Sequence, residues 1–163
     1  MELIFKHGWI FLIAMTSING LVFKYKSKKY IFDNPDLTDG YSRLFKGWLI
    51  WGNVPWIIMA IGDLTKITDG IGEYFNPRLL NPIVLIFHAS IIVIWIIGSR
   101  WIYLEEGAEF LAKHPGLIHF HSFGTSKDIT SSNTIKILWT LGIIGGIVGM
   151  IFMWTMKIPS MNY

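Results

Sequence analysis

The chain has 163 residues, of which 52% are hydrophobic and 15% are charged, whereas about 25% of the residues in a typical soluble domain are charged. It contains no cysteine, which excludes disulfides, thiolate nucleophiles, iron–sulfur clusters and cysteine-ligated zinc. The sequence pI of about 9.1 does not indicate nucleic-acid binding, because the positive charges lie beside apolar runs and form no basic patch on a nucleic-acid-reading fold. The apolar residues concentrate in four long runs. We therefore predict an all-α, polytopic membrane protein, a four-transmembrane-helix bundle that forms a single membrane domain over residues 1–163.

The four transmembrane helices are predicted at about residues 3–23, 45–63, 82–104 and 135–156. Each is long enough to cross a hydrocarbon core of about 30 Å at a rise of about 1.5 Å per residue. The first run has no small-residue cleavage site and is followed at once by the basic stretch KYKSKK, so we interpret it as a retained anchor and not a signal peptide.

Shorter elements are predicted from caps and helix-stop residues. Asn34 and Pro35 predict a short helix that leads into the second span, and Asn81 and Pro82 mark the start of the third. After the third span the helix is predicted to continue through EEGAEFLAK and to end at the sequence HPG that begins at His114. The stretch HSFGTSKDITSSNT is predicted to be a polar linker.

Lysine and arginine gather in the first and third connections between spans. The positive-inside rule then places these connections on the cytoplasmic-type side and both termini on the outer side. The rule holds for a bacterial inner membrane and for an organellar membrane, so both locations stay open. Anionic lipid is the predicted partner of the cluster after the first span, which consists of Lys24, Lys26, Lys28 and Lys29.

The second span contains Asn53 and Pro55 near its centre. Pro55 has no N–H, so the carbonyl of Trp51 loses its helical partner and the helix bends. Asn53 then has two interpretations. In the first, its amide hydrogen-bonds across to a neighbouring helix, which is the commoner use of a lone asparagine in a membrane. In the second, the bend opens a pocket and Asn53 faces a ligand. Either interpretation requires Asn53 to face protein and not lipid.

The fourth span contains two overlapping G-x-x-x-G pairs, Gly142 with Gly146 and Gly145 with Gly149. Small residues at this spacing allow another helix backbone to approach closely. The partner is the first or second span of the same chain, or a helix of another chain.

The histidines are the candidate cofactor ligands. His7 and His88 fall at nearly the same depth near the outer ends of the first and third spans, and two histidines so placed could hold one haem b if the spans are adjacent. A pocket for a quinone or another ligand near His88 is an alternative, as is a plain structural role for both. His114, His119 and His121 lack the further ligands that a metal site needs, so no metal is predicted and their role stays open.

No catalytic motif is present in the chain, and His88 is the only ionisable residue clearly inside a span, which disfavours catalysis and ion conduction. We therefore predict a non-catalytic subunit or assembly partner of a larger membrane complex, in contact with other membrane subunits or with further copies of itself. Two alternatives stay open. One is a redox subunit that binds haem b or quinone through His7 and His88. The other is a small-molecule transporter or sensor built around the Asn53–Pro55 bend.

Overall fold

The computed structural model of the chain describes residues 7–117, 119–122 and 125–155. Within this part, four helices are long and apolar enough to cross a membrane. They are α2 (Gly8–Asp33), α3 (Thr38–Leu64), α5 (Pro82–Leu104) and α7 (Ser132–Thr155). The short helical elements between them are η1 (Pro35–Leu37), α4 (Ile71–Tyr74), η2 (Pro77–Leu79) and α6 (Gly107–Lys113). The prediction of four long apolar helices is confirmed.

Local caps explain where η1 and α5 begin. The Asn81 side chain accepts a hydrogen bond from the Ile83 N–H and Pro82 is the first helical residue, so α5 has the predicted bounds. The Asn34 side chain accepts from the Asp36 N–H in the same way, which confirms the short element that leads into the second long helix. Helix α2 runs about three turns beyond its predicted end, because no helix-breaking residue follows until Asn34. The predicted positions 3–6 and 156 lie outside the described residues.

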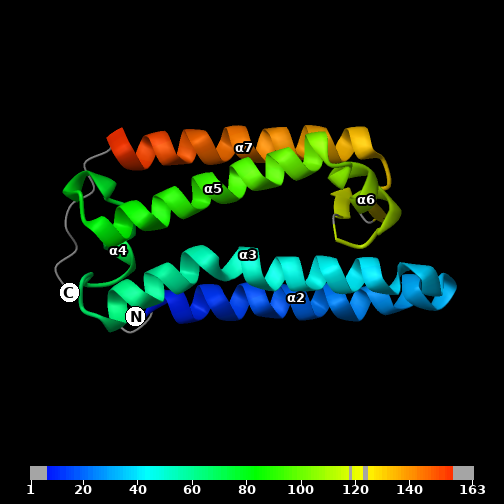
Figure 1. Cartoon of the computed structure of the whole chain (residues 1–163), viewed down its shortest axis with the longest axis horizontal. Coiled ribbons are helices and arrows are strands. Elements are labelled where there is room, and N and C mark those ends of the chain that lie inside the picture. Colours follow the sequence, from blue (N-terminus) through cyan, green and yellow to red (C-terminus); the bar gives the residue numbers. More distant parts are fainter. Residues whose placement is uncertain (1–6, 118, 123–124, 156–163) are drawn as a thin grey trace.

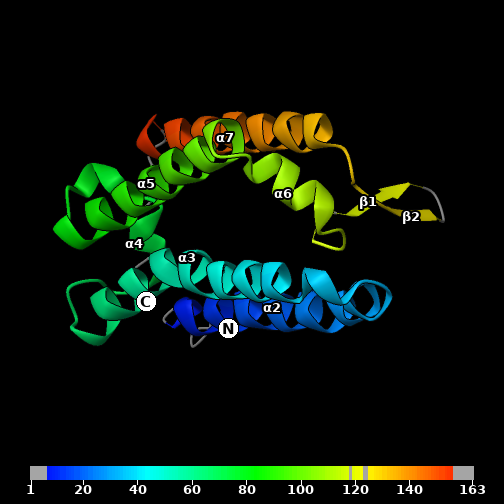
Figure 2. The ribbon, with the colours of Figure 1, turned by 45° about the vertical axis from the view of Figure 1, so that its right-hand side comes forward.

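Helices α2 and α3 form an antiparallel pair that lies side by side in Figures 1 and 2. Helix α2 presents a strip of mostly small residues to its partner: Thr16, Gly20, Phe23 and Ser27 are all buried. This strip allows two indoles of α3 to reach across. Trp48 Nε1 donates to the Thr16 carbonyl at 2.9 Å, and Trp56 Nε1 donates to the Thr16 hydroxyl at 3.2 Å. Close packing of small residues with interhelical hydrogen bonds is the usual means of joining two apolar helices.

Helices α5 and α7 form the second pair, in which each helix places an indole on a glycine of the other. A Cβ on Gly98 would lie 2.6 Å from the Trp139 ring, and a Cβ on Gly146 would lie 2.4 Å from the Trp95 ring. Trp139 Nε1 also donates to the Ser99 hydroxyl at 3.0 Å. The predicted close approach at Gly146 is therefore present, but the partner is the third span and not the first or second.

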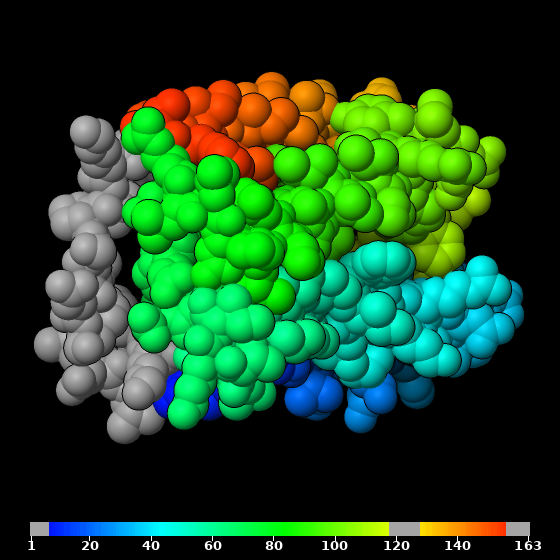
Figure 3. All heavy atoms as spheres, turned by 60° about the vertical axis from the view of Figure 1, so that its left-hand side comes forward, coloured from blue at the N-terminus to red at the C-terminus, as the bar shows by residue number. Residues whose placement is uncertain are grey.

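The two pairs form two layers that meet through α3 and α5 (Figure 2). We call the end of the bundle where α2 begins and α7 finishes the Gly8 end, and the opposite end the Asp33 end (Figure 1). Side chains fill the space between α3 and α5 on the face drawn in Figure 3. A buried core near the Gly8 end joins α3, α4 and α5, and it consists of Met59, Tyr74, Val84 and Phe87.

At the Asp33 end the structure corrects one prediction, because the third span does not continue as one helix. Helix α5 ends at Leu104, Glu106 adopts a left-handed φ of 55°, and α6 starts afresh at Gly107. A Cβ on Gly107 would lie 2.5 Å from the Trp101 ring, so only glycine fits beneath this indole. The resulting turn lets α6 pack on α5 and α7 through Ala108, and α6 ends at Lys113, directly before the predicted stop at His114.

A short hairpin lies between α6 and α7, where part of the chain was predicted to be a polar linker. Strands β1 (His119–Ser122) and β2 (Thr125–Asp128) pair antiparallel, with His119 opposite Asp128. Such pairing depends on a partner strand, which the composition of a polar stretch does not reveal. The described residues are otherwise helical or in turns, so the fold is all-α apart from this hairpin.

Candidate functional site

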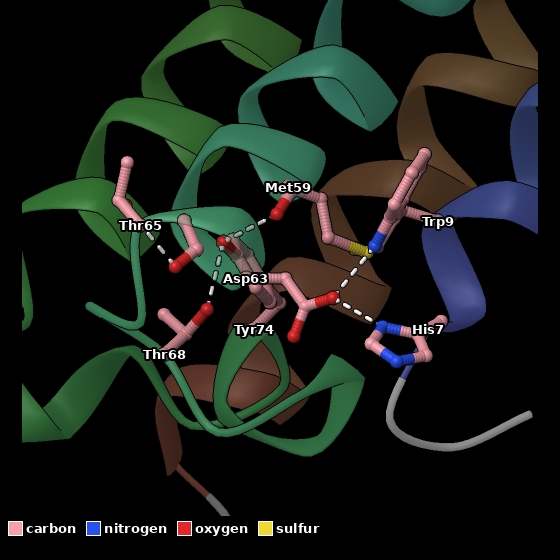
Figure 4. Close-up of polar contacts among 8 residues, drawn as sticks. His7, Trp9, Met59, Asp63, Thr65, Thr68 and Tyr74 are labelled. Atoms are coloured by element: carbon pink, nitrogen blue, oxygen red, sulfur yellow. Dashed lines mark hydrogen bonds and ion pairs between the residues drawn. The ribbon is translucent and has the colours of Figure 1, made fainter. Parts of the chain in front are cut away.

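Polar and ionisable side chains gather at the Gly8 end, where α2, α3 and the segment that contains α4 contribute to one cluster (Figure 4). His7 and Trp9 come from the start of α2, and Asp63 comes from the last turn of α3. Thr68 and Tyr74 come from the connection that contains α4. His88 lies nearby on α5 and is hydrogen-bonded to the same α4 segment.

Asp63 is the charged centre of this cluster, with a side chain that is only 6% exposed. One of its oxygens, Oδ2, lies 2.7 Å from His7 Nδ1 and also accepts from Trp9 Nε1 at 2.7 Å. Hydrogen bonds to an ionised carboxylate are roughly twice as strong as those between neutral groups. The bonds therefore tie the first turn of α2 to the last turn of α3. Sequence reasoning treated Asp63 only as the end of the second span. A carboxylate at the same depth as His7 and Trp9 could have indicated hydrogen bonds among these three residues.

Tyr74 connects the α4 segment to α3. Its hydroxyl donates to the Met59 carbonyl at 3.2 Å and lies 3.3 Å from the Thr68 hydroxyl, and the residue is 1% exposed. A Cβ on Gly62 would lie 2.1 Å from this hydroxyl, so the glycine makes room for the phenol. Burial raises the pKa of Tyr74 above its ordinary value, because a buried phenolate would lose its hydration.

His88 is buried, with 3% of its surface exposed. Its Nε2 lies 2.9 Å from the Tyr74 carbonyl, which can only accept, so Nε2 carries a proton, and in the neutral ring Nδ1 is then the hydrogen-bond acceptor. Nδ1 is buried and has no hydrogen-bond partner in the described part of the chain. The ring packs edge-on against Phe87 and Trp154, at centroid distances of 5.5 Å and 6.2 Å. His88 thus combines a fixed tautomer with an unused acceptor.

The structure places His7 and His88 at the same end of the bundle, but no hydrogen bond or ring contact among the described residues joins them. His7 is bonded to α3 and His88 to the α4 segment. In each imidazole one nitrogen is hydrogen-bonded to an oxygen and the other has no hydrogen bond to a described residue, which is the arrangement that metal-ligating histidines commonly have. Within the described ranges, no group of three His, Asp or Glu side chains is positioned to hold a metal ion. Joint ligation of a haem by these two residues stays a prediction.

Asn53 is 7% exposed, so the prediction that it faces protein is confirmed. Its Nδ2 donates to the Leu49 carbonyl at 2.8 Å within α3, whereas the favoured interpretation expected a bond to another helix. Asparagine can reach the carbonyl four residues earlier, and this local bond competes with one across the interface. The other amide atom, Oδ1, is buried without a partner in the described residues.

His114 has a packing role that sequence reasoning did not identify. It is 7% exposed, and its Nδ1 donates to the Phe110 carbonyl at 2.7 Å. A Cβ on Gly40 would lie 1.8 Å from His114 Nε2, so the ring rests directly on the backbone of α3. The Tyr41 hydroxyl donates to the Pro115 carbonyl at 2.8 Å and strengthens the same contact. The side chains of His119 and His121 lie outside what the structure describes.

The glycines of α7 differ in their surroundings. Gly146 packs against Trp95, whereas a Cβ added at Gly142, Gly145 or Gly149 would have no atom of the described structure within 4 Å. Ile135 is the only buried residue of α7 in its described length. Helix α7 therefore contacts α5 at one edge of its glycine stripe, at Gly146, and leaves Gly142, Gly145 and Gly149 as an open glycine face.

No family model matches this chain, and no curated protein or solved structure is similar to it. The function is therefore argued from the residues and contacts described above.

Proposed function

We propose that the protein is an integral membrane protein that serves as a non-catalytic subunit or assembly partner of a larger membrane complex. The observation that supports the proposal most directly is the open glycine face of α7, made by Gly142, Gly145 and Gly149. In a bilayer, helices associate through close packing at small residues, because lipid tails are as apolar as the side chains they replace. A face of this kind suits a helix of another membrane subunit or of a second copy.

The charge distribution supports an orientation for this membrane protein. The lysines after the first span and those of the third connection lie toward the Asp33 end, so this end faces the cytoplasmic-type side of a bacterial inner membrane or an organellar membrane. Both termini then face the outer side. At the same end the side chains of Lys24, Lys26, Lys28 and Lys29 are exposed on α2, where they suit the head groups of anionic lipid.

The experiment that tests assembly is a mass measurement by size-exclusion chromatography with light scattering. The tagged protein is purified from membranes of its source in mild detergent. The wild type should elute as a species larger than the 18.7 kDa chain, and Gly145→Leu should shift it toward the monomer. Gly47→Leu is the matched control, because Gly47 also has open space around it but lies on α3. A monomeric wild type, or equal behaviour of the two variants, contradicts the proposal.

A redox subunit that binds haem b or quinone through His7 and His88 is the second candidate. Its support is the buried Nδ1 of His88, which has no partner in the described residues. The test is the visible spectrum of the purified protein, reduced with dithionite and compared with the oxidised form. A haem b signal that disappears in both His7→Ala and His88→Ala would favour this candidate, and a colourless protein would remove the haem.

The third candidate is a small-molecule transporter or sensor at the Asn53–Pro55 bend. The unpartnered Oδ1 of Asn53 supports it, because a ligand donor could satisfy this buried acceptor. A ligand that raises the melting temperature of the wild type but not of Asn53→Leu would support this function.

A further inference from the structure

A groove of about 810 Å³ lies between α5 and α7. Its walls are almost entirely apolar, and they include Ile92 and Ile96 of α5 and Ile147 and Ile151 of α7. The indoles of Trp95 and Trp154 also line it. This groove is separate from the open glycine face, because at about 3.6 residues per turn Ile147 and Ile151 lie on the opposite side of α7 from Gly142, Gly145 and Gly149.

The packing of the two helices explains why the groove exists. Trp139 on Gly98 and Trp95 on Gly146 hold the helices together at the middle and toward the Asp33 end. Beyond Gly146 no further glycine of α7 receives an indole, and the two ribbons separate toward the Gly8 end (Figure 1). The space between them is therefore bordered mainly by branched aliphatic side chains.

A cation lies at the mouth of the groove. Arg78 of η2 is exposed, and its Nη1 donates to the carbonyl of Thr155, the last described residue of α7 and itself part of the groove lining. The ion pairs within the described part of the chain do not include Arg78. A guanidinium has five N–H donors, so most of them remain available for an anion such as a phosphate.

We propose that this groove binds an acyl chain of an anionic phospholipid whose phosphate lies at Arg78. The inference rests on the membrane insertion in the proposed function, but not on assembly into a complex. The wall from Ile143 to Thr155 is about 18 Å long at about 1.5 Å per residue, close to half of a hydrocarbon core of about 30 Å. A groove of this length suits one chain of one leaflet with its head group at the Gly8 end. A second helix would instead suit the flat glycine face, where backbones can approach.

Lipid retention is the direct test. The protein is exchanged into mixed micelles that contain equal amounts of phosphatidylglycerol and phosphatidylcholine with identical chains, and the bound lipid is counted by native mass spectrometry. The wild type should retain one phosphatidylglycerol in preference to phosphatidylcholine. Arg78→Gln should lower that preference about fivefold, as expected for one charge near a membrane surface. Lys66→Gln is the control, because Lys66 is an exposed cation in the connection between α3 and α4 and does not line the groove.

The part of the groove proposed to hold the acyl chain is tested by filling it with a larger side chain. Ile147→Trp should reduce retention of both lipids, whereas Ile144→Trp should not, because Ile144 is exposed but does not line the groove. Equal retention of the two lipids by the wild type overturns the proposal. The proposal also fails if inorganic phosphate displaces phosphatidylglycerol to the same extent as added phosphatidylglycerol. A change of mass by light scattering in Ile147→Trp overturns it in favour of another protein chain. None of these readouts depends on the open glycine face, so failure here is distinct from failure of the assembly proposal.

Discussion

Single side chains at the Gly8 end hold segments that are far apart in the sequence. The carboxylate of Asp63 joins α2 to α3, the hydroxyl of Tyr74 joins the α4 segment to α3, and His88 joins α5 to that same segment. All three are buried, so each hydrogen bond satisfies a group that would otherwise be costly to remove from water. This end of the bundle therefore depends on polar contacts as well as on its apolar core.

Removing the Asp63 carboxylate should weaken the Gly8 end. Asp63→Ala leaves the Trp9 N–H and His7 Nδ1 without their acceptor, and we expect a loss of about 1–3 kcal/mol of stability. The measurement is thermal unfolding in detergent, followed by circular dichroism. Asp69→Ala is the control, since Asp69 is exposed and its side chain makes no hydrogen bond in the described structure. Equal melting temperatures for the two variants would count against a structural role for Asp63.

The buried phenol of Tyr74 predicts a dependence on alkaline pH. Its pKa is raised in the folded state, so its contribution to stability is complete below the ordinary tyrosine pKa of about 10 and is lost as the pH rises above it. Tyr74→Phe should be less stable than the wild type at about pH 8, and the difference should shrink by about pH 11. Tyr25→Phe, at a position that is 75% exposed, should leave the pH profile of the melting temperature unchanged.

At the scale of whole elements, each helix pair has its own way of packing. The α2–α3 pair uses a strip of small residues on α2 and indole N–H bonds to Thr16. The α5–α7 pair uses indoles stacked on glycines, which fixes the helices at two points and leaves the groove beside them. The glycines of α7 therefore differ in role according to whether an indole of α5 covers them.

This difference can be measured with two substitutions on the same helix. Gly146→Leu must displace the Trp95 indole, and overpacking of this kind costs about 1–3 kcal/mol. Gly142→Leu adds the same side chain in open space and should leave the free energy of unfolding of the isolated chain within about 0.5 kcal/mol of the wild type. Comparable destabilisation by both substitutions would show that the α5–α7 contact is not where the structure has it.

At the scale of the whole molecule, the connections between the long helices lie at two opposite ends of the bundle, the Gly8 end and the Asp33 end. Asp69 and Leu80 lie in connections near the Gly8 end, and Lys29 lies in the last turns of α2 at the Asp33 end. If the four helices cross a membrane as proposed, these two groups lie on opposite sides of it. The charge rule then predicts which side is which.

The absence of cysteine makes this orientation simple to test. Asp69→Cys and Lys29→Cys each introduce one thiol at an exposed position. In intact cells or organelles a membrane-impermeant maleimide should label the first variant, and the second should react only after the membrane is opened. Labelling of both without permeabilisation contradicts four crossings, and the reverse pattern contradicts only the orientation.

The sequence by itself determined the features that depend on neighbouring residues. Apolar runs predict the long helices, and the Asn–Pro pairs at residues 34–35 and 81–82 mark helix starts, because caps and proline act within one turn. The burial of Asn53 also followed, since a polar amide at the centre of an apolar helix has to face protein. Of the candidate site, sequence reasoning identified His7 and His88 and their common end of the bundle, but not what they contact.

Only the tertiary structure decided the features that depend on distant partners. His7 and Asp63 are 56 positions apart in the chain, and the tautomer of His88 is set by a carbonyl in a different element. The break at Glu106 depends on Trp101 packing over Gly107, and the partner of α7 depends on indoles of α5. Contacts of this kind arise from the way the helices meet, and helix propensity or hydropathy carries no information about which faces will meet.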